Sequence, residues 1–569
     1  MLKKILIGTG IIFFVLILFL FVFQPINSVQ DMHTTPELSI TDAQDREIMH
    51  FINNHRTTPI EIEKMSQKNI DILLTIEDKT FYQHSGFNLS RILKTLASNL
   101  KKNQSHGAST ITQQYVKNVY LDNSKTFGRK FKELYYAIKL EQIASKDEIL
   151  ASYLNCIYLG NDIYGIANAS SYYFNKSYTD LSIKEMTTFV ALLNAPTYYS
   201  THLDKLEEKK NRLLTVLLEN NTITSKEYEQ AKTPIEFHLN PYIYNSNLLY
   251  FTDGVLKEYK AMNLNPKFNQ KVTIKTQYNM AMNTLAVTSP ANYASIAVNK
   301  DGFILAMIGD KDYYTSSFNI TVNGKRDIGS TIKPLLYYEA LKCGYSTKQT
   351  YYSGPYSFSY HNETITIKNN ASVYPYKDIS MREALATSDN IYAIKTHQAL
   401  GFKTLSNHLK KYNIDAKSLP SLALGSVGMS LQDLTRIYTQ FFTEGKYLKL
   451  RYIEQIHIDN KKHYQAKTEY KSLGSSEDFK KIKDLMSSIF DSSIPHSTAA
   501  SIASKLPTKC YGKSGLTDFD SYMMGFSDDI LIGVWSGYLD NQPLEDITSK
   551  RIPKEIFLKL INSYYGKPS

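Results

Sequence analysis

The sequence predicts a multidomain protein with an N-terminal membrane-spanning helix, an all-helical domain and an α/β domain. The chain has 569 residues, which is too long for a single hydrophobic core. Its 43% hydrophobic and 21% charged residues are typical of a folded protein. Along the chain, the hydrophobic pattern changes from a helical repeat to strand-like runs, which predicts the two different domains.

The uncharged run Ile5–Phe23 predicts the membrane span, because a helix of that length measures about 28 Å. Lys3 and Lys4 precede it and are expected in the cytoplasm. Residues 1–28 then form a cytoplasmic tip and signal-anchor, and the protein is a single-pass type II protein of the bacterial cell membrane with extracytoplasmic domains. A cleaved signal peptide is the alternative, but no small-residue cleavage site follows the run.

The net charge of +11 is compatible with nucleic acid, an anionic membrane surface or an acidic substrate as the partner. The predicted anchor argues against nucleic acid, and no zinc-finger spacing or RNP-like motif occurs. The three cysteines are far apart in sequence, so no disulfide framework is expected.

Residues 29–60 are polar and predict a stalk, and residues 61–232 predict the helical domain. Within it, residues 129–155 carry apolar positions near a 3.6-residue period. A further helix is predicted at Ser182–Leu193, where Ser182 can cap and Glu185 completes a capping box.

Residues 233–285 are rich in Asn, Tyr and Thr and predict a linker, and residues 286–569 predict the α/β domain. Two runs at 294–298 and 303–308, joined by an Asp-Gly turn, predict a hairpin. The runs Tyr522–Phe526 and Ile530–Trp535 predict another strand pair, with helical segments between the two pairs.

A serine acyl-transfer centre is the first predicted site. In Ser330-Thr-Ile-Lys333 the lysine follows the serine by three residues, so both side chains share one face of a helix. A serine needs such a base within hydrogen-bond reach, and the pKa of Lys333 must fall for it to act as one. The pattern alone is weak, because Ser98–Lys101 has the same spacing.

Two further elements follow Ser330 in an informative order: Ser388-Asp-Asn390 and Lys513-Ser-Gly515. Lys513 can supply the positive charge that lowers the pKa of Lys333. A glycine at position 515 leaves room for a substrate backbone to pair with the strand edge.

Together, these elements resemble the transpeptidase domain of class A penicillin-binding proteins. The resemblance implies a sheet with helices on both faces, of the penicillin-binding/β-lactamase type. It implies that Ser330 attacks the D-Ala-D-Ala carbonyl with Lys333 as base, and that Ser388 relays the proton to the leaving D-alanine. Asn390 would hold the peptide amide, and Lys513, Ser514 and Gly515 would bind the substrate.

The sequence departs from that family in the third element. Ser514 stands where the family usually has threonine, and the hydroxyl is retained. Leu516 replaces another threonine, which bears on substrate preference and β-lactam affinity. No candidate for a deacylating glutamate is found, so fast penicillin hydrolysis is not expected.

A second predicted site lies upstream. Inverting sugar transfer needs a carboxylate to take the acceptor proton and cations to neutralise a leaving pyrophosphate. Glu77, followed by Asp78, supplies the carboxylate. The cations are found in a basic stretch: Lys117, Lys125, Arg129, Lys130 and Lys132. Taken alone, each group is an ordinary solvated surface.

The segments Glu77–Phe81, Gly107–Gln114, Arg129–Glu133 and Glu148–Asn155 resemble, in order, the motifs of the family 51 peptidoglycan glycosyltransferases. The resemblance implies an all-helical lysozyme-like fold. It implies that Glu77 deprotonates the 4-hydroxyl of the acceptor lipid II, that Asp78 lies near the acceptor and that Glu133 acts at the donor site. The implied substrate-binding residues are Ser109, Thr110, Gln113, Gln114, Lys117, Lys125 and Arg129.

Lys125 stands where the family usually has arginine, so the charge is kept and the bidentate fork is lost. No organic cofactor is expected. The 13 histidines show no paired ligand spacing, so no protein metal site is expected, although a Mg²⁺ or Mn²⁺ ion could bridge the lipid pyrophosphate.

We therefore expect a bifunctional peptidoglycan synthase that polymerises lipid II into glycan strands and cross-links stem peptides. Expected partners are these substrates, β-lactams as inhibitors, the membrane and a cell-wall synthesis complex, with no nucleic acid. Three alternatives remain: a polymerase with an inert transpeptidase domain, a DD-carboxypeptidase and a β-lactam sensor. The sensor is disfavoured because only a few residues precede the predicted span.

Overall fold

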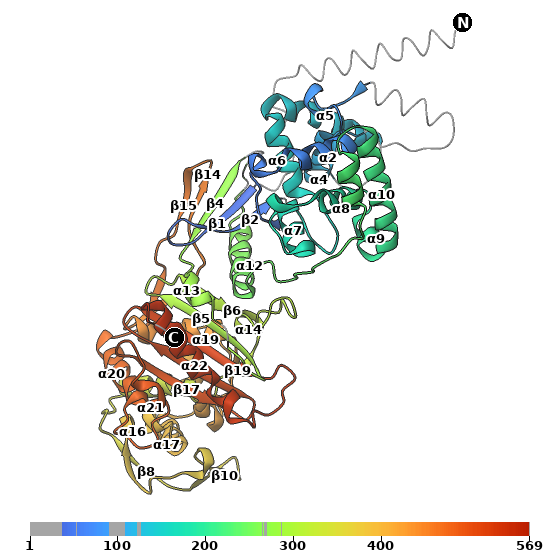
Figure 1. Ribbon diagram of the computed structural model, residues 1–569. Coiled ribbons are helices and arrows are strands. Elements are labelled where there is room, and N and C mark those ends of the chain that lie inside the picture. The colour runs from blue at the N-terminus through green and yellow to red at the C-terminus, as the bar shows by residue number, and fades with distance from the viewer. Residues whose placement is uncertain are drawn as a thin grey trace.

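The computed structural model describes residues 37–567 apart from 53, 90–108, 122–126, 265, 267–269 and 286 (Figure 1). The expected span Ile5–Phe23 lies outside this part of the chain. Within the described ranges, no helix combines the length and the apolar character that crossing a bilayer requires. The predicted anchor therefore stays a prediction.

A helical domain forms the N-terminal part of the described chain, as predicted (Figure 1). Its helices pack around one buried cluster that includes Phe81, Tyr153 and Phe189. They are α2 (Gln67–Glu77), α4 (Ile111–Tyr120), α5 (Phe127–Ile143), α6 (Lys146–Cys156), α7 (Ile166–Phe174), α8 (Ile183–Leu192), α9 (Pro196–Thr201), α10 (Leu203–Glu219) and α11 (Ser225–Ala231).

Capping explains where two of these helices begin. The periodic stretch 129–155 forms α5 and α6 rather than one helix, because Ser145 caps α6 and Glu148 completes a capping box. The periodicity did not reveal this break. The predicted box at Ser182 and Glu185 is confirmed at the start of α8.

A six-stranded sheet lies between the helical domain and the C-terminal domain (Figure 1). Its strand order is β15 (Lys461–Gln465), β14 (Ile453–Ile458), β4 (Lys271–Thr276), β1 (Glu37–Thr41), β2 (Glu47–Ile52) and β3 (His55–Thr57). Strand β1 pairs in parallel with β4, although the two are far apart in sequence. The expected stalk and linker thus differ from the structure: both supply strands, and the linker also forms α12 (Ser246–Ala261) and α13 (Met280–Asn283).

The C-terminal domain is built on an antiparallel five-stranded sheet. Its order is β17 (Tyr511–Leu516), β18 (Asp520–Phe526), β19 (Ile530–Gly537), β5 (Asn292–Asn299) and β6 (Ile304–Ile308). The two predicted strand pairs are β5–β6 and β18–β19, and both are confirmed. Strand β17 lies at one edge of the sheet, so its outer backbone groups are not used by a neighbouring strand of this sheet.

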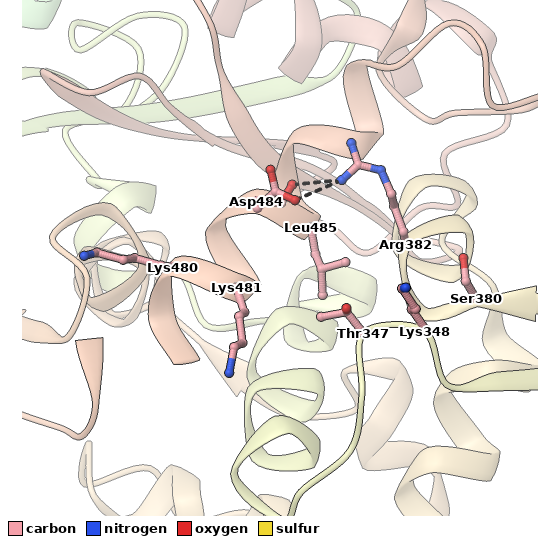
Figure 2. A pocket seen from close by; sticks show the side chains of 8 residues that line it. All are labelled: Thr347, Lys348, Ser380, Arg382, Lys480, Lys481, Asp484 and Leu485. Carbon is pink, nitrogen blue, oxygen red and sulfur yellow. Dashed lines mark hydrogen bonds and ion pairs between the residues drawn. The ribbon is translucent and has the colours of Figure 1, made fainter. Parts of the chain in front are cut away.

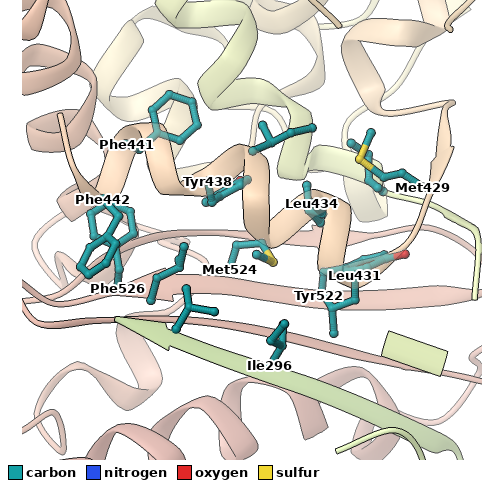
Figure 3. Close-up of a cluster of buried hydrophobic side chains, with 14 of the residues drawn as sticks. Ile296, Met429, Leu431, Leu434, Tyr438, Phe441, Phe442, Tyr522, Met524 and Phe526 are labelled. Carbon is teal, nitrogen blue, oxygen red and sulfur yellow. The ribbon is translucent and has the colours of Figure 1, made fainter. Parts of the chain in front are cut away.

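Helices cover both faces of this sheet, as the expected fold class requires. Helix α19 (Leu431–Phe442) packs on one face, where its apolar side chains meet Tyr522, Met524 and Phe526 (Figure 3). Helix α22 (Ile547–Tyr564) packs on the other face, against the cluster that contains Met523.

The remaining helices and short strands of this domain surround the sheet. The helices are α14 (Ile320–Asn323), α15 (Lys333–Lys342), α16 (Met381–Thr387), α17 (Asn390–Leu400), α18 (Lys403–Lys410), α20 (Ser476–Met486) and α21 (Ala500–Ala503), and the 3₁₀ turn η5 (Gly329–Ile332) leads into α15. The strands are β7 (Arg326–Asp327), β8 (Thr350–Ser353), β9 (Tyr356–Tyr360), β10 (Glu363–Ile367), β11 (Lys377–Ser380), β12 (Gly428–Met429), β13 (Lys446–Leu448) and β16 (Tyr470–Ser472).

Candidate active sites

The carboxyl group of Glu77 lies at the end of α2, where the side chain is almost fully buried. Gln114 Nε2, from α4, donates a hydrogen bond of 2.8 Å to Glu77 Oε2. The hydroxyl of Tyr153, from α6, donates to Gln114 Oε1 over 2.9 Å. Three helices therefore meet at this carboxylate, and the Tyr153–Gln114 chain fixes which way it points.

Asp78 is fully buried and performs a structural task. Its Oδ2 accepts a hydrogen bond from the backbone N–H of Ile111, in the first turn of α4, over 3.0 Å. The same oxygen lies 2.9 Å from His84 Nε2. A carboxylate at a helix N-terminus stabilises that end, so Asp78 holds α4 beside Glu77.

Glu133, in α5, is buried beneath two cations. Arg129 Nη1 lies 3.0 Å from Glu133 Oε2, and Lys130 Nζ pairs with Glu133 Oε1. Lys130 Nζ also donates to the hydroxyl of Ser109 over 2.8 Å. One cation thus connects α5 to the segment before α4, and the positive charge gathers at one place.

Two of the expected cleft residues have another role. Thr110 and Gln113 are buried and form the capping box of α4. Thr110 Oγ1 also donates to the carbonyl of Gly86 over 2.8 Å. Lys117 is exposed in the last turn of α4, and Lys125 lies outside the described residues. Among the predicted cleft residues, Gln114 and Ser109 make the polar contacts described above.

Ser330 lies in η5, one turn before the helix that carries Lys333. Pro334 occupies the first turn of α15, where a missing N–H is tolerated, as predicted. Gly329 has φ +54°, and a side chain there would press on the backbone of Leu516 at 3.2 Å. The sharp entry to this turn therefore needs glycine.

Lys333 is fully buried and contacts the second element. Its Nζ lies 2.6 Å from the carbonyl of Ser388, 3.3 Å from the Ser388 hydroxyl and 2.8 Å from Asn390 Oδ1. Burial lowers the pKa of Lys333 to about 7, against the opposing charge of Asp389. The neutral amine is therefore accessible near neutral pH. Among the described residues, Ser330 itself makes no side-chain hydrogen bond, so this amine faces Ser388 more directly than Ser330.

The turn that carries Ser388 is held by its neighbours. Ser388 has φ 60°, in the left-handed region. Asp389 caps α17 through the Tyr392 N–H at 2.7 Å and also accepts from Ser353 and Asn369. This network supports the position of the Ser388 hydroxyl, and it is a role that the sequence did not suggest for Asp389.

Lys513 is fully buried in the edge strand β17, with its Nζ 2.7 Å from the carbonyl of Ser514. Burial, with the positive charges of Lys333 and Lys554, holds the pKa of Lys513 well below its usual range. At Gly515 a Cβ atom would meet Thr331 Cγ2 at 2.8 Å and the Ile328 carbonyl at 2.9 Å. This glycine lets β17 pack on η5, which is a different reason from the one expected.

The three elements meet at one cavity of about 910 Å³. Ser330, Ser388, Asn390 and Ser514 all line it, and β17 forms one wall. The wall contributed by α22 was not anticipated from the sequence. Within the described ranges, no group of three or more His, Cys, Asp or Glu side chains is placed to hold a metal ion. The cavity can therefore place a peptide carbonyl between a hydroxyl and two buried amines.

Sequence comparison identifies two families in the chain. Residues 44–219 match the model described as Transglycosylase, and residues 293–539 match the Penicillin binding protein transpeptidase domain. Penicillin-binding protein 2D of Bacillus subtilis (strain 168) is 32% identical over 90% of this chain and 78% of its own length. Penicillin-binding protein 4 of the same organism is 27% identical over 90% and 88%.

Structural comparison agrees in fold. Penicillin-Binding Protein 1A from Haemophilus influenzae superposes with a TM-score of 0.61, covering 94% of this chain and 93% of that one, at 18% identity. Both halves of the architecture are thus found together in a known protein. The chain belongs to the class A penicillin-binding proteins, bifunctional enzymes that carry a peptidoglycan glycosyltransferase and a D-Ala-D-Ala transpeptidase.

Proposed function

We propose that Glu77 is the base of glycan polymerisation. It takes the proton of the acceptor 4-hydroxyl while that oxygen bonds to the donor sugar and the lipid pyrophosphate leaves. Its contact with Gln114 supports this role, because an oriented carboxylate needs no reorganisation before it reacts. Lys117, Arg129 and Lys130 balance the charge of the leaving group, and Lys125 is proposed to help them. A bridging Mg²⁺ or Mn²⁺ ion is part of this proposal.

In the second half of the protein, Ser330 Oγ attacks the peptide carbonyl while Lys333 takes its proton. Ser388 passes a proton to the amine of the leaving D-alanine, and an acyl-enzyme forms. A second stem peptide then supplies the amine that releases the acyl group as a cross-link. The observation that carries this proposal is the buried Lys333 amine held between Ser388 and Asn390.

The alternatives concern this second half. A DD-carboxypeptidase would use water in place of the amine, and an inert domain would not acylate at all. The acyl-transfer geometry favours a working serine, because a buried amine with a pKa near 7 costs stability and is typical of a functional site. The membrane anchor at residues 5–23 and partners in a cell-wall synthesis complex complete the proposal, since lipid II stays in the bilayer.

The test is a crossed assay on purified full-length protein with lipid II and a fluorescent penicillin. Glu77→Gln is expected to abolish glycan synthesis and to leave penicillin labelling intact. Ser330→Ala is expected to do the opposite, because the two centres use separate groups. Cross-linked muropeptides should appear only when both centres work.

Three results would reject parts of the proposal. Retained polymerisation in Glu77→Gln would remove that residue from the role of base. Absence of labelling in the wild-type protein would favour the inert domain. Free D-alanine without cross-linked dimers would favour the carboxypeptidase.

A further inference from the structure

The first two turns of α22 place three cations on the wall of the serine cavity: Lys550, Arg551 and Lys554. The helix is fixed against the sheet, because Gly525 of β18 leaves room for the ring of Phe557. The carbonyl of Lys550 accepts a hydrogen bond of 2.9 Å from Ser521 of the same strand. These cations are therefore presented by a rigid helix rather than by a loop.

The strand register places Ser514 on the same face of the sheet as α22. Ser514 pairs with Met523, and Met523 belongs to the cluster packed against α22. Cross-strand partners point to the same face, so the Ser514 hydroxyl faces this helix. Lys513 pairs with Met524 and points to the opposite face, toward Lys333. Ser514 thus faces α22, and Lys513 faces the nucleophile.

Hydrogen-bond donors on that face come from α22. Leu516 is the next residue of β17 with the same orientation, because side chains alternate along a strand. It is partly exposed at the cavity and has no polar atom to offer. An anionic group beside Ser514 would find its remaining donors on the helix.

Lys554 and Arg551 form no ion pair with any carboxylate in the part of the chain that the structure describes. Burial and the neighbouring Arg551 lower the pKa of Lys554. A second cavity, of about 550 Å³, gives a contrast (Figure 2). There, Arg382 lies 3.2 Å from Asp484, so the charge is already balanced within the protein.

The serine cavity carries a positive balance. Its lining holds four cations and two carboxylates: Lys368, Lys550, Arg551 and Lys554 with Asp518 and Glu545. Lys513 and Lys333 are fully buried beside it. Unpaired cations that are partly removed from water favour an anionic ligand, because such a ligand recovers the charge–charge interaction lost on burial.

We propose that Lys554 and Arg551, with the Ser514 hydroxyl, bind the terminal carboxylate of the substrate peptide and select for a leaving residue with a free carboxylate. The inference rests on the proposed acylation of Ser330 in this cavity. It adds α22 to the binding site and makes the two cations specificity-determining residues.

The experiment measures the second-order rate of Ser330 acylation by a fluorescent penicillin, as the free acid and as its methyl ester. The wild-type protein is expected to favour the acid. Lys554→Met should slow acylation by the acid about tenfold or more and leave the ester rate nearly unchanged, because only the acid carries the charge that Lys554 binds. Arg551→Gln should act in the same direction, and Lys554→Arg should keep the preference.

Lys505→Met is the matched control, because it removes one exposed positive charge away from the cavity and should leave both rates unchanged. Equal rates for acid and ester, or an equal loss of both in Lys554→Met, would overturn the inference. If Lys554→Met does not fold, as judged by its melting curve, the exposed Arg551→Gln decides. Absence of acylation in the wild type would instead reject the proposed function of Ser330.

Discussion

The two centres of this protein treat charge in opposite ways. In the glycosyltransferase centre, Arg129 and Lys130 are paired with Glu133 and keep their positive charge at the surface of the helical domain. In the transpeptidase centre, Lys333 is fully buried and its pKa falls to about 7. A site that neutralises pyrophosphate needs fixed cations, whereas a site that activates a hydroxyl needs an amine that can be neutral.

The supporting structure differs in the same way. Glu77 is oriented by side chains of two other helices, Gln114 and Tyr153. The serine centre uses turns and a sheet edge, where backbone carbonyls of Ser388 and Ser514 accept from the lysines. The comparison teaches that one centre is set by helix packing and the other by burial against a strand.

The largest expected effect comes from Lys333→Met, which keeps the length of the side chain and removes the amine. Penicillin acylation should fall by about 10² to 10⁴, the usual contribution of a positioned base. Polymerisation of lipid II should stay within about twofold of wild type, since Lys333 belongs to the other centre. Stopped-flow labelling and a glycan-length assay measure the two effects. A loss of both activities would mean that the two centres are not independent.

A smaller effect is expected from Gln114→Leu, which removes the hydrogen bond to Glu77. Polymerisation should fall about ten- to a hundredfold, because a hydrogen bond to a charged group contributes about 1.5–3 kcal/mol. Tyr153→Phe should cause a milder loss, because it only frees the Gln114 amide. Penicillin labelling serves as the internal control for folding. If Gln114→Leu polymerised at the wild-type rate, Glu77 would not depend on this orientation.

The smallest effect is the pH dependence of acylation. Because the pKa of Lys333 is lowered to about 7, the neutral amine dominates above that pH, and the protonated form dominates below it. The acylation rate should therefore fall about tenfold per pH unit below about pH 7 and level off above it. A rate profile over about pH 5.5 to 9 measures this. An inflection near the ordinary lysine pKa would show that burial does not tune this amine.

The motifs were readable because their chemistry is local. Ser330 and Lys333 are one turn apart, and the capping box at Ser182 and Glu185 needs only neighbouring residues. The two strand pairs at the sheet were also predicted, since hairpins join adjacent segments. By contrast, the six-stranded sheet was missed, because β1 and β4 pair across a long separation in sequence that no local pattern reports.

The sequence by itself determined the chemistry of the two centres: a serine with a lysine one turn away, and a glutamate followed by a basic stretch. Only the tertiary structure decided the neighbours of each group. It gave Thr110 and Gln113 to a helix cap, Asp78 to the start of α4, and the α22 cations to the serine cavity. The reason is physical: residue type sets what a side chain can do, and burial and long-range packing decide which partners it meets and which charge it can keep.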